Sequence, residues 1–266
     1  MDEPKIQQRR VLFESSGLRV TSTSYTAGCI FTPHRDSLSR ITLTLAGAVA
    51  EDVADTAVTV TPGDILLKSS HILHENRYSA TGAKHVTIEA LPATESPDEI
   101  NLTDIIDDIG WQRLQGTTAI QYTALLLDAS LHVSGNMLHA TINDICTSTQ
   151  TNKRRPIAPS WLKLLKSEVQ ESGFICGDLN LYAEAAGVHP VHVSRLFRQC
   201  FGMSITLFAQ CHAVKRALQL MAAQLSLADI AATAGFYDQS HMGRVFRRCT
   251  GFTPGEYKRL WQQALC

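Results

Sequence analysis

The chain has 266 residues, of which 44% are hydrophobic and 18% charged, a balance that supports a packed core and argues against wholesale disorder. The length favours two domains, no stretch approaches the ~18 apolar residues of a membrane span, and the first ten residues lack the pattern of a secretory signal. Seven cysteines without a CxxC pair argue against a disulfide framework or structural zinc site, so we expect a protein of the reducing cytoplasm.

The net charge of −1 hides an uneven distribution along the chain. Residues 1–150 hold 10 Lys and Arg against 18 Asp and Glu, a net charge of −8, whereas residues 151–266 hold 14 against 7, a net charge of +7. This asymmetry indicates that only the second half meets a polyanion.

The first ninety residues have the alternation of half-buried strands. Apolar and polar residues alternate from Ile41 to Leu45, from Val58 to Val60 and around Val86 and Ile88, with Gly, Pro and Asp turns between them. This period of two predicts an antiparallel β sandwich or barrel.

The pattern changes after Pro97. Residues 101–108 and 117–132 have helical character, and the polar segment TSTQTNKRRPIAPS at 147–160 is predicted to be an interdomain linker. Everything after Trp161 is predicted to be helical.

The second half contains an internal repeat. The segment AEAAGVHPVHVSRLFRQCFG at 183–202 matches AATAGFYDQSHMGRVFRRCTG at 231–251, with Gly187 and Gly235 aligned at an offset of 48. Arg195 and Phe197 align with Arg244 and Phe246 at an offset of 49, so one residue has been inserted in the turn.

Each copy has the pattern of a helix-turn-helix unit. A short Ala-rich helix precedes the glycine, which supplies the backbone freedom of a sharp reversal. The second helix begins at Pro190 in one copy and after Asp238, a good N-cap, in the other. Its apolar stripe follows helical spacing in both copies: Val193, Leu196, Phe197 and Phe201, then Met242, Val245, Phe246 and Cys249.

A single long helix is predicted to connect the two copies, over residues 204–222. It spans roughly 28 Å, which suits two reading helices placed near one DNA turn (~34 Å) apart. The alternative is an ordinary all-α domain whose repeat serves packing alone. Two matched copies on a basic module favour DNA binding.

The second copy, GFYDQSHMGRVFRRCTGFTPGEYK at 235–258, resembles the signature of the AraC/XylS family of transcription regulators, and the resemblance covers residues 161–262. It implies two helices that enter successive major grooves. The residues it implies as base-reading are Val191, Ser194, Arg195, Gln239, Ser240, Gly243 and Arg244. Arginine suits this role because its fork bonds guanine O6 and N7 together. Arg198, Arg247 and Arg248 are expected to neutralise phosphates and to set register.

The first half resembles the cupin-like effector domain of that family, with TPGDILL at 61–67 as its turn and strand. The effector pocket is expected to use six side chains: His34, Asp36, Arg40, His74, Asn76 and Thr87. Arg40 suits a clamp for an anionic or hydroxyl-rich molecule.

Metal binding is not expected in this pocket. At the ligand positions of metal cupins only His34 and His74 match, Asp36 stands for a histidine, and Arg40 would repel a divalent cation. We therefore expect no metal and no cofactor, although a mixed site that uses His34, Asp36, His71 or His74 stays open.

These observations predict an α+β chain with an N-terminal antiparallel, cupin-like β barrel and following helices, and a C-terminal all-α domain with two helix-turn-helix units. The expected division is 1–100 for effector binding, 101–146 for a helical dimerisation segment, 147–160 for a linker and 161–266 for DNA binding.

The expected function is a cytoplasmic, homodimeric transcription regulator, an activator by family habit. It would bind promoter DNA, a small effector and RNA polymerase, with no membrane association and no enzymatic activity. Three alternatives stay open: a metal- or redox-responsive regulator of the same class, a cupin enzyme fused to a DNA-binding domain, and an alkylation-repair fusion with a sacrificial cysteine.

Overall fold

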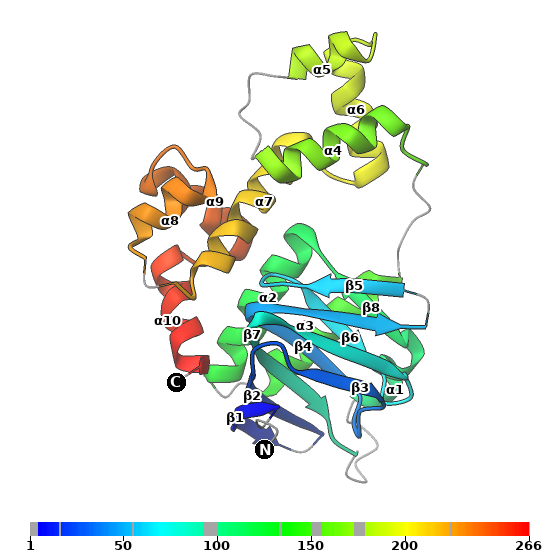
Figure 1. Cartoon of the computed structure of the whole chain (residues 1–266), viewed down its shortest axis with the longest axis vertical. Helices are drawn as coiled ribbons and strands as arrows, with labels where there is room; N and C mark the ends of the chain where they lie inside the picture. Colours follow the sequence, from blue (N-terminus) through cyan, green and yellow to red (C-terminus); the bar gives the residue numbers. More distant parts are fainter. Residues whose placement is uncertain are drawn as a thin grey trace.

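The computed structural model describes residues 5–265 apart from 16, 55, 93–100, 133–134, 151–155, 173–178 and 224. It confirms an α+β architecture with an antiparallel sheet followed by helices (Figure 1). The strands are β1 (Ile6–Ser15), β2 (Leu18–Tyr25), β3 (Ile30–His34), β4 (Arg40–Val53), β5 (Thr56–Val60), β6 (Ile65–Lys68), β7 (His74–Ala90) and β8 (Trp111–Leu114).

The long strands β4 and β7 organise the sheet, whose order is β1-β2-β7-β4-β6-β8, with β3 on β7 and β5 on β4. Their register pairs Arg40 with Glu89 and Val53 with His74.

We call this sheet the β domain. Because side chains alternate along a strand, the β domain has two unlike faces. One is apolar and buried, with Leu18, Val20, Ile41, Leu43, Leu45, Ile65, Leu67, Val86 and Ile88. The other is polar and lines a cavity, with Thr21, Thr23, Thr42, Thr44, His85, Thr87 and Glu89.

The helices follow the predicted pattern closely. They are α1 (Leu102–Ile109), α2 (Gly116–Leu131), α3 (Gly135–Gln150), α4 (Ser160–Ser172), α5 (Leu179–Ala185), α6 (Pro190–Phe201), α7 (Ile205–Leu220), α8 (Leu227–Ala234), α9 (Gln239–Thr250) and α10 (Pro254–Leu265). The helices expected at 101–108 and 117–132 are α1 and α2. The short strand β8 between them was not predicted.

The expected linker at 147–160 needs a correction at its start, because α3 continues to Gln150. Ile145 and Cys146 are buried in the core, and Thr147 Oγ1 donates to Asn143 O (2.8 Å). The packing of these two side chains keeps this part of the chain helical. Lys153, Arg154 and Arg155 lie outside the described residues.

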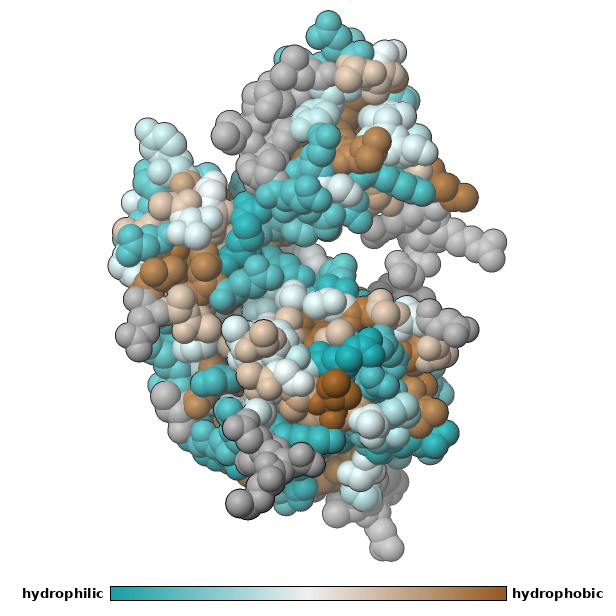
Figure 2. Space-filling view, viewed as in Figure 1, coloured by the Kyte–Doolittle hydropathy of each residue, from teal (hydrophilic) through white to brown (hydrophobic). Residues whose placement is uncertain are grey.

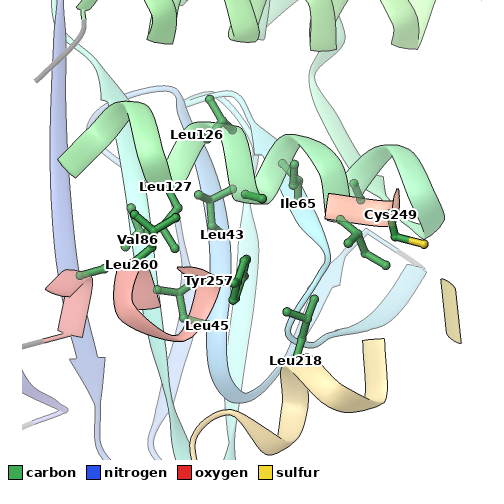
Figure 3. Packing of buried hydrophobic residues seen from close by; sticks show 14 of the residues in the cluster. Leu43, Leu45, Ile65, Val86, Leu126, Leu127, Leu218, Cys249, Tyr257 and Leu260 are labelled. Atoms are coloured by element: carbon green, nitrogen blue, oxygen red, sulfur yellow. The ribbon is translucent and has the colours of Figure 1, made fainter. Parts of the chain in front are cut away.

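The main core joins the β domain to the C-terminal helices. Helix α2 covers the apolar sheet face, and its other sides pack against α3, α7, α9 and α10. Figure 3 shows Leu126 and Leu127 of α2 together with Leu43 and Val86 of the sheet, beside Tyr257, Leu260 and Leu218 from the C-terminal helices. Within α2 only Thr118 and Gln121 are exposed.

A separate core holds the first helix-turn-helix unit. It contains Leu162, Leu165 and Val169 of α4 with Val193 and Phe197 of α6, closed by the start of α7. The C-terminal helices therefore divide between two cores. One contains α4, α5, α6 and the first turns of α7, and the other contains the rest of α7 with α8, α9 and α10.

Polar contacts at the turn before β6 fix the C-terminal helices on the β domain. The carboxylate of Asp64, which is fully buried, accepts from Lys215 Nζ of α7 (2.7 Å) and from Arg113 of β8 (3.0 Å). Gly63, at φ 88°, leaves space for Leu218, since a Cβ added there would lie 3.2 Å from the leucine Cδ1. Trp261 Nε1 of α10 donates to Leu45 O (2.9 Å).

Among the described residues, no helix is long and apolar enough to cross a membrane.

Leu127→Ala should destabilise the protein by about 2–5 kcal/mol, because it opens a cavity in the core that joins the sheet to the C-terminal helices. Chemical denaturation followed by tryptophan fluorescence and circular dichroism measures the loss. The control is Leu164→Ala on α4, whose side chain is 66% exposed and which should change stability by less than about 0.5 kcal/mol. Equal effects of the two substitutions would contradict this account of the core.

Candidate functional site

The first helix-turn-helix unit consists of α5 and α6. Gly187 makes the reversal with φ 65°, and Ala183 is buried on the inner face of α5. His189 caps α6, since its Nδ1 accepts from Val191 N (3.3 Å), and Pro190 occupies the first turn as predicted.

The second unit, α8 and α9, repeats this construction. Gly235 has φ 86°, and the buried Ala231 and Ala234 allow close packing of α8. Asp238 caps α9 by accepting from His241 N (2.6 Å), as its sequence position predicted. Figure 1 shows the two units at opposite ends of α7, a helix of 16 residues or about 24 Å.

The predicted base-reading residues lie on the outer faces of α6 and α9. Val191 is 67% exposed, and Arg195, Gln239, Ser240 and Arg244 are also exposed. Ser194 and Gly243 are half-buried, and a Cβ added to Gly243 would meet nothing within 4 Å. Neither Arg195 nor Arg244 bonds to another described residue, so both guanidinium groups are open to an outside partner.

The three arginines predicted to contact phosphate are exposed, but they differ in their surroundings. Arg198 and Arg247 lie in the last turns of α6 and α9. Arg248 already donates to Gln210 Oε1 of α7 and is therefore partly held within the protein.

Tyr237 is a surface residue that the sequence analysis did not single out. Its side chain is 92% exposed in the turn before α9, two residues before the predicted reading residue Gln239. The repeat comparison could have indicated it, because it lies in the turn that gained a residue.

The predicted effector residues surround a cavity of about 380 Å³ on the polar face of the β domain. Five of them line it: His34, Asp36, Arg40, Asn76 and Thr87. The sixth, His74, is buried beside them with its ring 4.3 Å from that of His34. The structure adds lining residues that the predicted pocket did not include: Tyr25, Thr44, Glu51, Lys68, Tyr78, His85 and Glu89. His85 and Glu89 share the strand face of Thr87, so the period of two could have found them.

Ion pairs neutralise most of the charges in this cavity. Arg40 lies 3.2 Å from Asp36, Lys68 lies 3.1 Å from Glu51, and Arg9 lies 2.8 Å from Glu89. Burial alone would raise the pKa of Asp36, but Lys68 and Arg40 outweigh it and hold that pKa below its usual value.

Several buried polar atoms of the cavity have no hydrogen-bond partner among the described residues. They include Thr44 Oγ1, His85 Nε2 and Glu89 Oε2. Burial and the nearby Lys68 lower the pKa of His85 to about 3, so its imidazole is neutral at physiological pH. Unsatisfied buried groups are costly, and a bound molecule or ordered water would relieve that cost.

The sequence comparisons concern the C-terminal helices. Residues 182–260 match a family described as a helix-turn-helix domain. The chain is 32% identical over 82 residues to the arabinose operon regulatory protein of Escherichia coli, covering 30% of this chain and 28% of that protein. It is 31% identical over 102 residues to the transcriptional activator RhaR of Yersinia pseudotuberculosis, covering 37% and 34%. The matches therefore span about a third of these relatives.

Solved structures resemble the chain at low similarity, over different shares of its length. ToxT from Vibrio cholerae covers 92% of this chain and 99% of its own, with a TM-score of 0.38 and 10% identity. KdgF from Halomonas sp. covers 34% of this chain and 84% of its own, with a TM-score of 0.30 and 20% identity.

Two capped helix-turn-helix units, each with an open arginine on its outer face, agree with the relatives that match this segment. Residues 182–260 form a helix-turn-helix domain, similar to the matching segments of transcription regulators such as the arabinose operon regulatory protein and RhaR.

Proposed function

We propose that the whole chain is a transcription regulator that reads promoter DNA with α6 and α9 and responds to a small molecule bound in the β domain. The observation that carries the proposal is the exposure of Arg195 and Arg244 on two equivalent helices, without partners among the described residues. The helices contact successive major grooves, and the arginines read guanine edges.

The effector is a hydroxyl-rich molecule without net charge. Arg40, Lys68 and Arg9 are already paired with carboxylates, and the exposed Arg35 at the edge of the cavity donates to His71 O (3.0 Å), so no unpaired cation lies in the buried part of the cavity among the described residues. What the cavity offers instead is a set of unpartnered hydrogen-bonding atoms, with the stacked rings of the half-buried Tyr25 and the buried Tyr78 beside them. Hydroxyl groups donate and accept, which suits both a carboxylate oxygen and a neutral imidazole.

The β domain supplies the path from effector to DNA. Its polar face lines the cavity, and its apolar face packs against α2, which contacts α7, α9 and α10. An effector that prefers one arrangement of the strands therefore biases the position of the second unit, and the coupling equals its difference in affinity for the two arrangements.

Two subunits pair through α1 and α3, because α2 is almost entirely covered within one chain. We place the regulator in the cytoplasm, acting as an activator through RNA polymerase and without enzymatic activity.

Arg244→Ala should weaken binding to the promoter by about 1–3 kcal/mol and relax base preference at one position, because the bidentate contact to guanine is lost. Quantitative footprinting on the bound promoter measures both effects. Arg259→Ala, an exposed arginine on α10, is the matched control and should leave affinity and preference unchanged. If Arg244→Ala kept the wild-type affinity and base preference, Arg244 would not read a base.

The logarithm of the DNA-binding constant should fall linearly with the logarithm of salt concentration, because each neutralised phosphate releases counterions. Arg247→Ala should make this slope less negative by about 1, whereas Arg259→Ala should leave it unchanged. Fluorescence anisotropy over a salt series gives the slopes. A flat dependence for the wild type would argue against phosphate contacts.

Thr44→Val should lower effector affinity about five- to tenfold, the value of one hydrogen bond, while DNA binding without effector stays unchanged. Thermal-shift screening of neutral sugars and polyols, arabinose included, identifies the binder, and calorimetry gives its affinity. Thr123→Val is the control, since that buried hydroxyl bonds Ala119 O within α2, away from the cavity. If the affinity of the identified molecule were the same for the wild type and Thr44→Val, its binding site would lie outside this cavity.

A further inference from the structure

Three side chains in the wall of the β domain cavity have the donors of a metal site. The ligand atoms of His34, Asp36 and His74 lie within 4.8 Å of one another. Each histidine places Nδ1 against a backbone carbonyl, His34 on Thr32 O (2.8 Å) and His74 on Ile72 O (3.1 Å). That contact leaves the Nε2 lone pairs free, as in metal-binding histidines, and two imidazoles with a carboxylate suit zinc, iron or nickel.

A lysine side chain enters the same cluster. Lys68 Nζ lies 3.2 Å from Asp36 Oδ2, the oxygen that faces His74 Nε2 at 3.6 Å. It also lies 3.1 Å from Glu51 Oε2, and its side chain is almost fully buried. One ammonium group therefore contacts both carboxylates nearest to the two histidines.

The surrounding structure holds this lysine in place. Lys68 pairs in register with Arg40 of β4 and with Trp111 of β8, so its backbone is fixed on both sides. Glu51 is itself held by Trp111 Nε1 (2.7 Å) and by Asn76 (2.9 Å). If Lys68 swung away, it would leave a buried carboxylate without its counter-charge, which is costly.

The donor set therefore does not fit a metal in the presence of this lysine. The negative charges that would neutralise a divalent ion are already paired, Asp36 with Lys68 and Arg40, and Glu51 with Lys68. A divalent ion bound to Asp36 would also lie within a few ångströms of the ammonium, and at an effective dielectric of about 20 such repulsion reaches several kcal/mol.

We propose that Lys68 is a tethered cation that takes the place of a metal ion between Asp36, Glu51 and the two histidines, and that it excludes divalent metals from the cavity. The cavity is then a hydrogen-bonding site without Lewis-acid chemistry. The inference concerns metal exclusion alone, so its test is independent of DNA binding.

The experiment compares the full-length wild type with Lys68→Met in titrations with Co²⁺, followed by calorimetry and visible absorption. Lys68→Met should gain one site per chain, with affinity at least about 100-fold above any binding by the wild type at these residues, because the ammonium beside Asp36 Oδ2 is gone while Arg40 stays on the other oxygen, Oδ1. Adding His74→Ala to Lys68→Met should abolish the gained site. Lys163→Met, an exposed lysine on α4, is the matched control and should gain nothing.

Two results would overturn the proposal. One is a wild-type protein that binds one equivalent of Co²⁺ and loses it on His74→Ala. The other is a folded Lys68→Met protein that gains no site. Lys68→Gln, which keeps a polar side chain, replaces Lys68→Met if circular dichroism shows that the methionine variant is unfolded, and the same two outcomes then decide.

Discussion

The packing of one apolar sheet face against α2 is the contact on which the rest of this structure depends. Because strand residues alternate, burying Leu43, Val86 and their neighbours on one side turns Thr44, His85 and Thr87 to the other. The same helix then carries α7, α9 and α10 on its remaining sides. A single layer of side chains thus separates the cavity wall from the helix that positions the second DNA-binding unit.

The buried carboxylate of Asp64 fixes the position of α7 relative to the β domain more specifically than this apolar contact does. Hydrophobic packing tolerates sliding, whereas a carboxylate that bonds both Lys215 and Arg113 specifies one position of α7. Burying such a group costs desolvation energy, so its net contribution to stability is small, and its effect is on which arrangement forms. Gly63, in the same turn as Asp64, leaves space for Leu218 of α7. The ion pairs of Asp64 and the packing of Leu218 therefore favour the same position of α7.

The sequence predicted the parts of the structure that local pattern determines. Alternation at 41–45 located β4, and the repeat with its cap residues Pro190 and Asp238 located both helix-turn-helix units. It did not predict β8, a strand of four residues, or Lys68, because the unbroken apolar run of β6 hides which face that lysine takes. Nor could it pair Asp64 with Lys215, which lies 151 residues further along the chain, since tertiary packing alone brings them together.

The two DNA-binding units differ in how much apolar surface they bury against the β domain and α2. Separating α9 and α10 from α2 would expose Leu127, Tyr257 and their neighbours to water, at roughly 25 cal/mol for each Å² of apolar surface. The first unit keeps its own core around Phe197, so a displacement of α4, α5 and α6 leaves most of that surface buried. The distance between the two reading helices is therefore easier to change from the side of α6 than from the side of α9.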